Sequence, residues 1–290
     1  MGLAVLHPDR NFSTIASQGL AVEQVMAQLE HAKTGALLAG EPARRALFCD
    51  ADTCAEMLEV RRTLHVEPTG SIEAGELRPW LKAPASGDGL RVVVNEGAGP
   101  YLCRPPQMGA DIAVEDLGDL FGEAFDGLAF VAARSERALE RFLRAIGADA
   151  PDAAAPVLPG VRNLLAHMLP QLALITQARC DRALVAAQFL AHHPRVAWVR
   201  YPGLAEDAAN AEARRSMEHG FGWRVAFKPV EDARGFACGL WESPLGALSS
   251  RVEVLPDGAC VLHAGLEEAL DVVGALEKGI ACPKPTDDCA

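Results

Sequence analysis

Residues 90–95, with the sequence LRVVVN, carry a clear strand pattern from which the fold can be worked out. The run of β-branched side chains is typical of a buried strand, because stiff branched residues pack well on a pleated surface. Gly87 and Gly89 precede this run, and Gly97 and Gly99 follow it. We therefore expect a central strand that ends in a loop, of the kind found in sheets covered by helices on both faces.

The segments around this strand alternate between strand and helix patterns. Strands are expected at residues 46–49, 111–114 and 128–132, and helices at 20–32, through Met57 and Leu58, at 73–81 and at 135–146. Alternation of this kind predicts an α/β domain with a mainly parallel sheet.

The second half of the chain begins with a connector and a long helical region. Residues 147–159 are rich in proline and glycine, and the helical pattern over 161–192 is interrupted at Pro170. Further strands are expected at 196–201, 223–227, 251–255 and 259–263, and helices at 207–217, 230–240 and 267–278. Pro256-Asp257-Gly258 is a hairpin turn signal. We expect two domains, a large α/β domain over 1–157 and a bridging helix with a C-terminal α/β domain over 158–290.

Composition narrows the function classes. A net charge of −12 removes the long-range attraction to phosphate on which nucleic-acid binding and anionic membranes depend. Residues 1–10 lack the pattern of a secretory signal, and no apolar run approaches the ~20 residues of a membrane span, so we expect a cytoplasmic protein. The eight cysteines form no C-x-x-C pair, and most are expected to be buried thiols. Cys282 and Cys289 lie in a polar tail, which is either disordered or makes a redox or metal contact.

Two polar groups could carry chemistry but have simpler explanations. Glu115, Asp116 and Asp119 could form a metal or acid/base cluster, and we expect them instead to be solvated after a strand. His192 and His193 stand at the end of the long helix, where a cation interacts favourably with the helix dipole. No metal site is predicted, and no dinucleotide, P-loop or nucleophile-elbow motif occurs.

Longer motifs carry a family resemblance. VVVNEGAGPYLCRPPQMGADI (92–112), HHPRVAWVRYPGL (192–204), GFG (220–222) and DGACVLHAGLEE (257–268) resemble segments of the Cys/Met-metabolism enzymes that depend on pyridoxal phosphate (PLP). This family includes cystathionine synthases and lyases and O-acetylhomoserine sulfhydrylases. The resemblance implies the fold-type-I architecture, with a mainly parallel large domain and a small C-terminal α/β domain. It also implies a shortened large domain, because the match thins before residue 90.

The same resemblance implies that the residues of the family's chemistry are replaced. That chemistry needs an amine that forms an imine with the cofactor, a carboxylate at the pyridine nitrogen and a cation for the substrate carboxylate. The lysine position falls on Asp119 and the arginine position on Val261. The aspartate position falls on Val94, or on Asn95 if the register moves by one residue. Residues 11–14 stand near the position of the phosphate clamp, without its tyrosine and arginine.

The absence of the family's lysine cannot result from misalignment. The chain has five lysines, Lys33, Lys82, Lys228, Lys278 and Lys284, so none lies between residues 83 and 227. We therefore expect no catalytic residue and no covalently bound cofactor, and the leading hypothesis is a pseudoenzyme. Its role would be that of a structural or regulatory subunit in a homo-oligomer or with an active relative.

Two alternatives stay open. The altered pocket could bind another small molecule, such as a sulfur amino acid, as a sensor or a new enzyme, with polar contacts from Asn95, Glu96 and Asp119. His263, beside the Val261 position, could line that pocket or be a buried, hydrogen-bonded histidine. The other alternative is an active PLP-dependent lyase or sulfhydrylase with an altered mechanism. Trp198 and Tyr201 are expected in the core of the C-terminal part.

Overall fold

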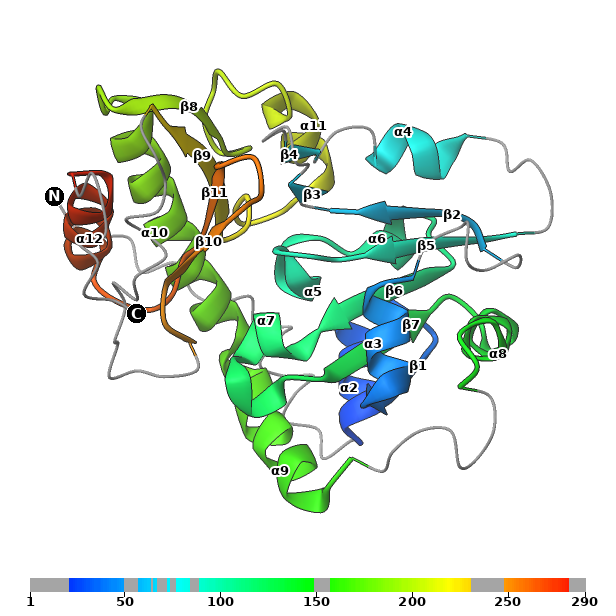
Figure 1. Ribbon diagram of the computed structural model, residues 1–290. Helices are drawn as coiled ribbons and strands as arrows, with labels where there is room; N and C mark the ends of the chain where they lie inside the picture. The colour runs from blue at the N-terminus through cyan, green and yellow to red at the C-terminus, as the bar shows by residue number, and fades with distance from the viewer. Residues whose placement is uncertain are drawn as a thin grey trace, which may run out of the picture. The chain divides into compact units, whose positions relative to one another are not determined.

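The computed structural model describes residues 21–49, 57–63, 65–66, 72–73, 77–83, 89–148, 157–230 and 248–281. The chain divides into two compact units (Figure 1). Unit 1 comprises Met1–Arg61, Leu81–Asn95 and Gly99–Thr176, and unit 2 comprises Arg62–Trp80, Glu96–Ala98 and Gln177–Ala290. In this division the chain passes between the two units several times, whereas the prediction has a single boundary at 157/158. The predicted boundary stays a prediction.

Unit 1 is built on a sheet with the strand order β1-β7-β6-β5-β2. Its strands are β1 (Thr34–Ala39), β2 (Met57–Arg62), β5 (Leu90–Val94), β6 (Ile112–Asp116) and β7 (Leu128–Ala133). Its helices are α2 (Val22–Leu29), α3 (Glu41–Leu47), α5 (Gly99–Leu102), α6 (Pro105–Met108), α7 (Leu117–Phe121), α8 (Glu136–Ala145) and α9 (Pro159–Met168), with 3-10 turns at Glu123–Phe125 and Leu169–Gln171. The helix α10 (Leu172–Ala191) begins in unit 1 and ends in unit 2.

Strand directions agree with the expected α/β class. The strands β5 and β6 are parallel, whereas β7 is antiparallel to both β6 and β1. Three of these four strands, β1, β5 and β6, therefore run the same way, and β7 runs against them. The strand expected from LRVVVN is confirmed as β5, an inner strand of the sheet.

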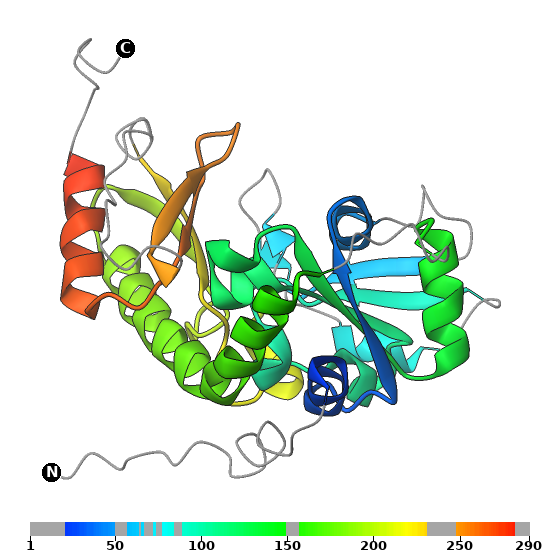
Figure 2. The same ribbon diagram turned by 90° about the horizontal axis from the view of Figure 1, so that it is seen from below.

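The two faces of this sheet are covered by different helices. Val92, Val94, Ile112 and Val114 pack with Ala43, Ala46 and Phe142 in one apolar core, which places α3 and α8 on that face. Figure 2 shows α2, in the darkest blue, on the opposite side of the sheet from α3. Successive strand side chains point to opposite faces. Glu115, the residue after Val114, therefore points toward the face that α2 covers.

The N-terminal third of unit 1 differs from the expectation in three places. Residues 46–49 end the helix α3 instead of forming a strand, because Pro42 starts a helix whose buried face includes Ala43 and Ala46. Met57 begins a strand instead of continuing a helix. The strand β1 was not predicted, since Gly35 weakens its pattern. Glycine is required there because a Cβ would overlap the ring of Phe130 on β7.

Unit 2 holds an antiparallel sheet with the order β10-β11-β9-β8. Its strands are β8 (Val196–Arg200), β9 (Arg224–Pro229), β10 (Arg251–Val254) and β11 (Cys260–His263), with a small pair β3 (His65–Val66) and β4 (Ile72–Glu73). Its helices are α11 (Asn210–Ser216) and α12 (Ala269–Ala281), and α4 (Leu77–Lys82) crosses the unit boundary. The predicted turn is confirmed between β10 and β11, where Gly258 has φ 81°.

Several expectations fall outside the described residues. They concern residues 11–14, the helix predicted beyond Val230, and the tail with Cys282 and Cys289. The four described cysteines, Cys49, Cys103, Cys180 and Cys260, are buried thiols. Among the described helices, none combines the length and hydropathy that a membrane span requires.

Candidate functional site

A buried polar cluster lies where β5 and β6 end in unit 1. Asn95 follows β5, and its backbone N–H donates to Val114 O across the parallel pair at 2.8 Å. The Asn95 side chain donates from Nδ2 to Glu115 Oε1 at 2.5 Å and to Cys103 O at 3.0 Å. Asn95 is 3% exposed and Glu115 is fully buried. The amide thus fixes the Glu115 carboxyl group within the protein interior.

A second carboxyl group reaches Glu115 from the face covered by α2. Glu30 is the C-cap residue that directly follows α2, and it is also fully buried. The carboxyl groups of Glu30 and Glu115 are hydrogen-bonded to each other. Carboxylates only accept hydrogen bonds, so this contact requires a proton on one of them. Burial raises the pKa of Glu30 from 4.5 to about 7, and burial together with the Glu30 carboxylate raises that of Glu115 well above its usual range.

Two further charges act on this pair. The Arg104 guanidinium lowers the pKa of Glu30, and the Asp119 carboxylate raises that of Glu115, in both cases as lesser effects than burial. Asp119 is 7% exposed and lies in α7, whose N-terminus Asp116 caps by accepting from Gly118 N at 2.9 Å and Asp119 N at 3.2 Å. The expectation that Glu115 and Asp119 are solvated was therefore wrong, because the strand β6 carries Glu115 inside the unit.

The structure separates the two registers left open for Val94 and Asn95. Val94 is the last residue of β5 and packs in the apolar core between the sheet and α3 and α8. Asn95 lies in the polar cluster with Glu115. Asp119 acts on the same cluster through its charge. Of these three sequence-predicted positions, Asn95 and Asp119 thus belong to one polar site and Val94 does not.

The other three predicted positions, Glu96, Val261 and His263, lie in unit 2. Glu96 Oε1 is 3.0 Å from Arg224 Nη1, and Glu96 Oε2 is 3.8 Å from Arg62 Nη1. Val261 is 3% exposed in β11. Ala226 of β9 and Glu253 of β10 stand beside it in register. An aliphatic side chain therefore occupies the position at which the resemblance implies an arginine.

His263 forms part of a basic row across three strands of the same sheet. It is 4% exposed and stands in register with Arg224 on β9 and Arg251 on β10. Its Nε2 lies 3.4 Å from Glu253 Oε2. The hydrogen bond with His263 lowers the pKa of the Glu253 carboxyl group. This row is thus balanced by the two acids Glu96 and Glu253, and His263 is the buried, paired histidine that the sequence left as one of two possibilities.

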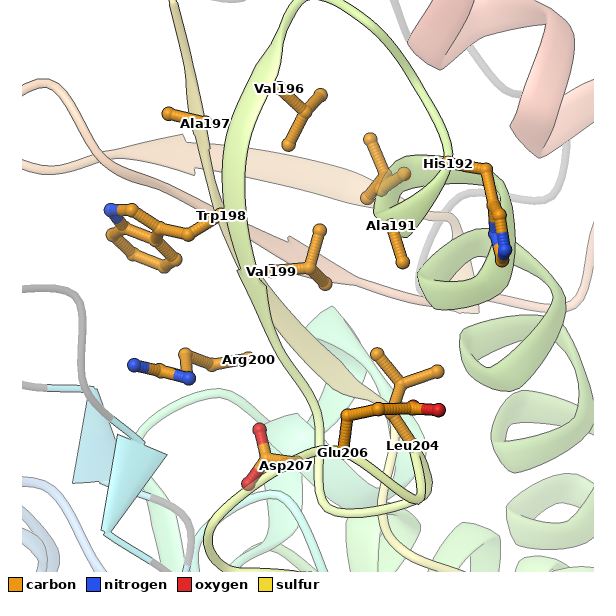
Figure 3. A pocket seen from close by; sticks show the side chains of 11 residues that line it. Ala191, His192, Val196, Ala197, Trp198, Val199, Arg200, Leu204, Glu206 and Asp207 are labelled. Carbon is orange, nitrogen blue, oxygen red and sulfur yellow. The ribbon is translucent and has the colours of Figure 1, made fainter.

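A cavity of about 340 Å³ lies elsewhere in unit 2, beside β8 (Figure 3). Figure 3 shows Trp198 and Arg200 on one side of the strand and Val199 on the other. Trp198 lines this cavity instead of filling the core, whereas Tyr201 is 1% exposed. None of the six sequence-predicted residues lines it. In the ranges that the structure describes, no group of three acids, histidines or cysteines is placed to hold a metal ion.

Comparison with known proteins identifies the family. The family model described as "Cys/Met metabolism PLP-dependent enzyme" matches residues 83–236, which is more than half of the chain. The chain belongs to this family. The match to the Cys/Met metabolism family includes β5, Asn95, β6 and Asp119, and therefore most of the polar cluster of unit 1.

Curated relatives in the Cys/Met metabolism family are enzymes of sulfur amino acids. The chain is 35% identical over 132 residues to an L-methionine gamma-lyase of Pseudomonas deceptionensis, covering 45% of this chain and 32% of the relative. It is 29% identical over 216 residues to a cystathionine gamma-synthase of Mycobacterium tuberculosis, covering 65% and 53%. A putative cystathionine gamma-lyase of Streptomyces coelicolor is 27% identical over 251 residues, covering 79% and 62%. The chain thus spans about a third to three fifths of these relatives.

Solved structures show the same fold. A cystathionine gamma synthase from Xanthomonas oryzae pv. oryzae, in complex with cystathionine, has a TM-score of 0.72 at 18% identity, covering 92% of this chain and 87% of that one. A cystathionine gamma-lyase from Lactobacillus plantarum, complexed with L-serine, also has a TM-score of 0.72 at 18% identity, covering 98% and 91%. The fold-type-I α/β class is therefore confirmed.

These findings correct the expectation about the cofactor. The chain was expected to take none, but the family to which it belongs is PLP-dependent. PLP is thus the cofactor that the family implies. The cluster in unit 1 offers an amide at Asn95 and carboxyl groups at Glu30, Glu115 and Asp119. These side chains do not fit an imine link at position 119, since none of them carries an amine.

Sequence reasoning missed the pair of Glu30 and Glu115. A signal for it existed, because Glu115 is an acid that directly follows the apolar run Ile112-Ala113-Val114. An acid that continues such a strand is rarely buried without a partner. Its partner Glu30 lies at the end of a helix far away in the sequence, and nothing in the local pattern connects the two.

Proposed function

We propose that this chain is a catalytically inactive member of its family, a pseudoenzyme that serves as a structural or regulatory subunit. The observation that carries the proposal is the carboxylate of Asp119 at the position where the family resemblance implies an amine. Enzymes of this kind need that amine as a nucleophile. A carboxylate cannot replace it, since it forms no imine.

The distribution of lysines supports this proposal. Within residues 83–236, the range that the family model matches, Lys228 is the single lysine. It lies on β9 in unit 2, where its Nζ donates to Asp257 O at 2.9 Å and lies 3.9 Å from Asp257 Oδ2. Lys228 thus binds Asp257 in the turn between β10 and β11. Asp119 lies in unit 1 within a cluster of acids.

Two further groups that the family's chemistry needs are also replaced in this chain. Asn95 is neutral, so it offers no charge to a protonated pyridine nitrogen. Val261 offers no bidentate partner for a substrate carboxylate. Three separate groups of the family's chemistry are thus replaced, while the sheet and the motifs around them persist.

A subunit role is supported by apolar side chains on the surface. Leu158 and Leu174 are 67% and 58% exposed, and Leu164 is 43% exposed. All three belong to the continuous segment formed by α9 and the beginning of α10. Exposed leucines gathered in one segment are typical of protein interfaces. We propose assembly with a second copy or with an active relative, in the cytoplasm, where the buried thiols stay reduced.

The catalytic part of the proposal is tested by turnover. Purified protein with saturating PLP should release keto acid from L-methionine and from L-cystathionine no faster than free PLP does. Asp119→Lys should gain a borohydride-reducible adduct on residue 119, because it restores an amine beside the acids Glu30 and Glu115. Glu140→Lys, an exposed change on α8, serves as the matched control. Turnover by the wild-type chain above the free-PLP rate contradicts the proposal.

The subunit part is tested by assembly. Light scattering of the purified chain should give a mass above one copy, or co-expression with an active family enzyme should give a stoichiometric complex. Leu164→Glu together with Leu174→Glu should weaken either assembly, whereas Glu140→Gln should not. A monomer that binds no family enzyme argues against the role. In that case, a panel of sulfur amino acids in a thermal-shift assay tests the small-molecule alternative.

A further inference from the structure

The contact between Glu30 and Glu115 requires a proton on one of the two carboxyl groups. Both side chains are fully buried. In the part of the chain that the structure describes, no N–H or hydroxyl group donates to either Glu30 oxygen or to Glu115 Oε2. The two carboxyl groups contact each other instead. A buried acid without a donor is costly, and a shared proton satisfies both groups at once.

The position of the pair gives this proton a structural effect. Glu30 ends α2, where its own N–H donates to Met26 O, and Glu115 lies in β6. Asn95 fixes one oxygen of Glu115 by its 2.5 Å hydrogen bond. Glu115 is thus anchored to the sheet, and the end of α2 is held to it through the shared proton.

We propose that Glu30 and Glu115 form a proton-dependent latch, which holds the end of α2 on β6 while one carboxyl group is protonated and releases it when that proton is lost. The step is a simple ionisation, in which the carboxyl O–H bond breaks and the proton passes to solvent. Two carboxylates then face each other in the core, where like charges repel strongly.

The surrounding charges set the pH range over which the contact between Glu30 and Glu115 is lost. Arg104 faces Glu30 and favours ionisation there, whereas Asp119 on α7 faces Glu115 and opposes it. Asn95, after β5, is neutral and donates to Glu115. Glu30, with a pKa of about 7, ionises first and then accepts the hydrogen bond from Glu115. Glu115 therefore holds the shared proton, and because its pKa is raised well above the usual range, the release occurs above neutral pH.

The linkage between protons and stability has a definite sign. The folded pKa values of both acids lie above the unfolded value of 4.5, so the folded state binds more protons than the unfolded state above that pH. The contribution of the pair is complete below pH 4.5 and is lost as the pH rises, first through the pKa of Glu30 at about 7 and then through the higher pKa of Glu115. The wild-type protein should therefore become less stable toward neutral and alkaline pH.

The experiment compares wild-type protein with Glu115→Gln between pH 5 and pH 8. The amide that this substitution introduces can donate to Glu30 and still accept from Asn95, so no shared proton is needed. The midpoint of thermal unfolding of the wild type should fall by about 5 °C more than that of the variant over this range. Glu140→Gln, which changes an exposed acid on α8, should keep the wild-type slope. An unchanged slope for Glu115→Gln overturns the proposal.

A second variant and a direct probe keep the test decisive if Glu115→Gln fails to fold. Glu30→Gln removes the other acid and should flatten the slope in the same way. The infrared band of a protonated carboxyl group should be present in the wild type at pH 6, should weaken as Glu30 ionises near pH 7, should be lost only at higher pH as Glu115 ionises, and should be missing from either variant at alkaline pH. If the wild type shows no such titrating band, the latch does not exist, whatever the protein's catalytic status.

Discussion

In unit 1, two buried glutamates meet each other and need a proton to do so, whereas in unit 2 the buried cations that the structure describes meet a partner of complementary charge or an aromatic ring. Arg179 is 4% exposed, stacks 4.2 Å from the Trp223 ring centroid and donates from Nε to Ala264 O at 2.8 Å. Arginine stays charged at any pH near neutrality, so these contacts of Arg179 keep their charge state there. The Glu30–Glu115 contact of unit 1 thus depends on pH, whereas the Arg179 contacts of unit 2 do not.

The largest effect is expected in unit 2, and it tests whether the Arg179 contacts are insensitive to pH. Arg179→Ala removes the stacking on Trp223 and leaves the carbonyl of Ala264 without its donor, at a cost of about 3 kcal/mol. Because arginine stays charged, the loss should be the same at pH 5 and pH 8. Chemical unfolding at both values measures it, with the exposed Arg137→Ala on α8 as control. A loss that changes with pH contradicts the comparison.

A smaller effect is expected when the repulsion in unit 1 is reduced. Asp119→Asn removes the charge that raises the pKa of Glu115 while keeping the shape of the side chain. The pair then loses its proton with less repulsion, and the unfolding midpoint at pH 8 should rise by about 1–2 °C. At pH 5 the gain should be smaller. The exposed Glu123→Gln is the control, and a lower midpoint at pH 8 would show that Asp119 stabilises the cluster.

The smallest effect concerns Glu253 in unit 2 and has the opposite pH sign. The hydrogen bond with His263 lowers the pKa of Glu253, so its contribution is present above the unfolded pKa and is lost as the pH falls through the folded one. The Glu253 side chain is 59% exposed, so Glu253→Gln should cost less than about 0.5 kcal/mol at pH 6. The cost should be smaller at pH 3. Unfolding curves at the two values check this, and an effect that grows in acid contradicts it.

Much of the fold could be predicted because its signals are local. β5 follows from its β-branched run, and the break between α9 and α10 follows from Pro170, which lies in the 3-10 turn Leu169–Gln171. β1 could not be predicted from its own residues. Gly35 is favoured there by the ring of Phe130, which lies on a strand almost a hundred residues later in the chain.

The sequence predicts which residues of the family's site are replaced, but it does not predict how the remaining polar residues are arranged. Asp119 and Asn95 stand out by their places in a motif. The burial of Glu115 depends on which face of the sheet α2 covers, and its partner Glu30 depends on where α2 ends. Local periodicity gives neither fact, since both follow from the tertiary packing.

The strand order of unit 1 places the Glu30–Glu115 contact late in folding. β1 follows α2 directly, yet it lies at the edge of the sheet and joins it through β7, the last strand of that sheet in the chain. Contacts between distant segments generally form after local ones, because closing the long loop costs entropy first. We therefore expect the helix that carries Glu30 to dock after the other strands of the sheet have paired. At neutral pH its glutamate arrives ionised, so capture of a proton becomes part of the final closure of the unit.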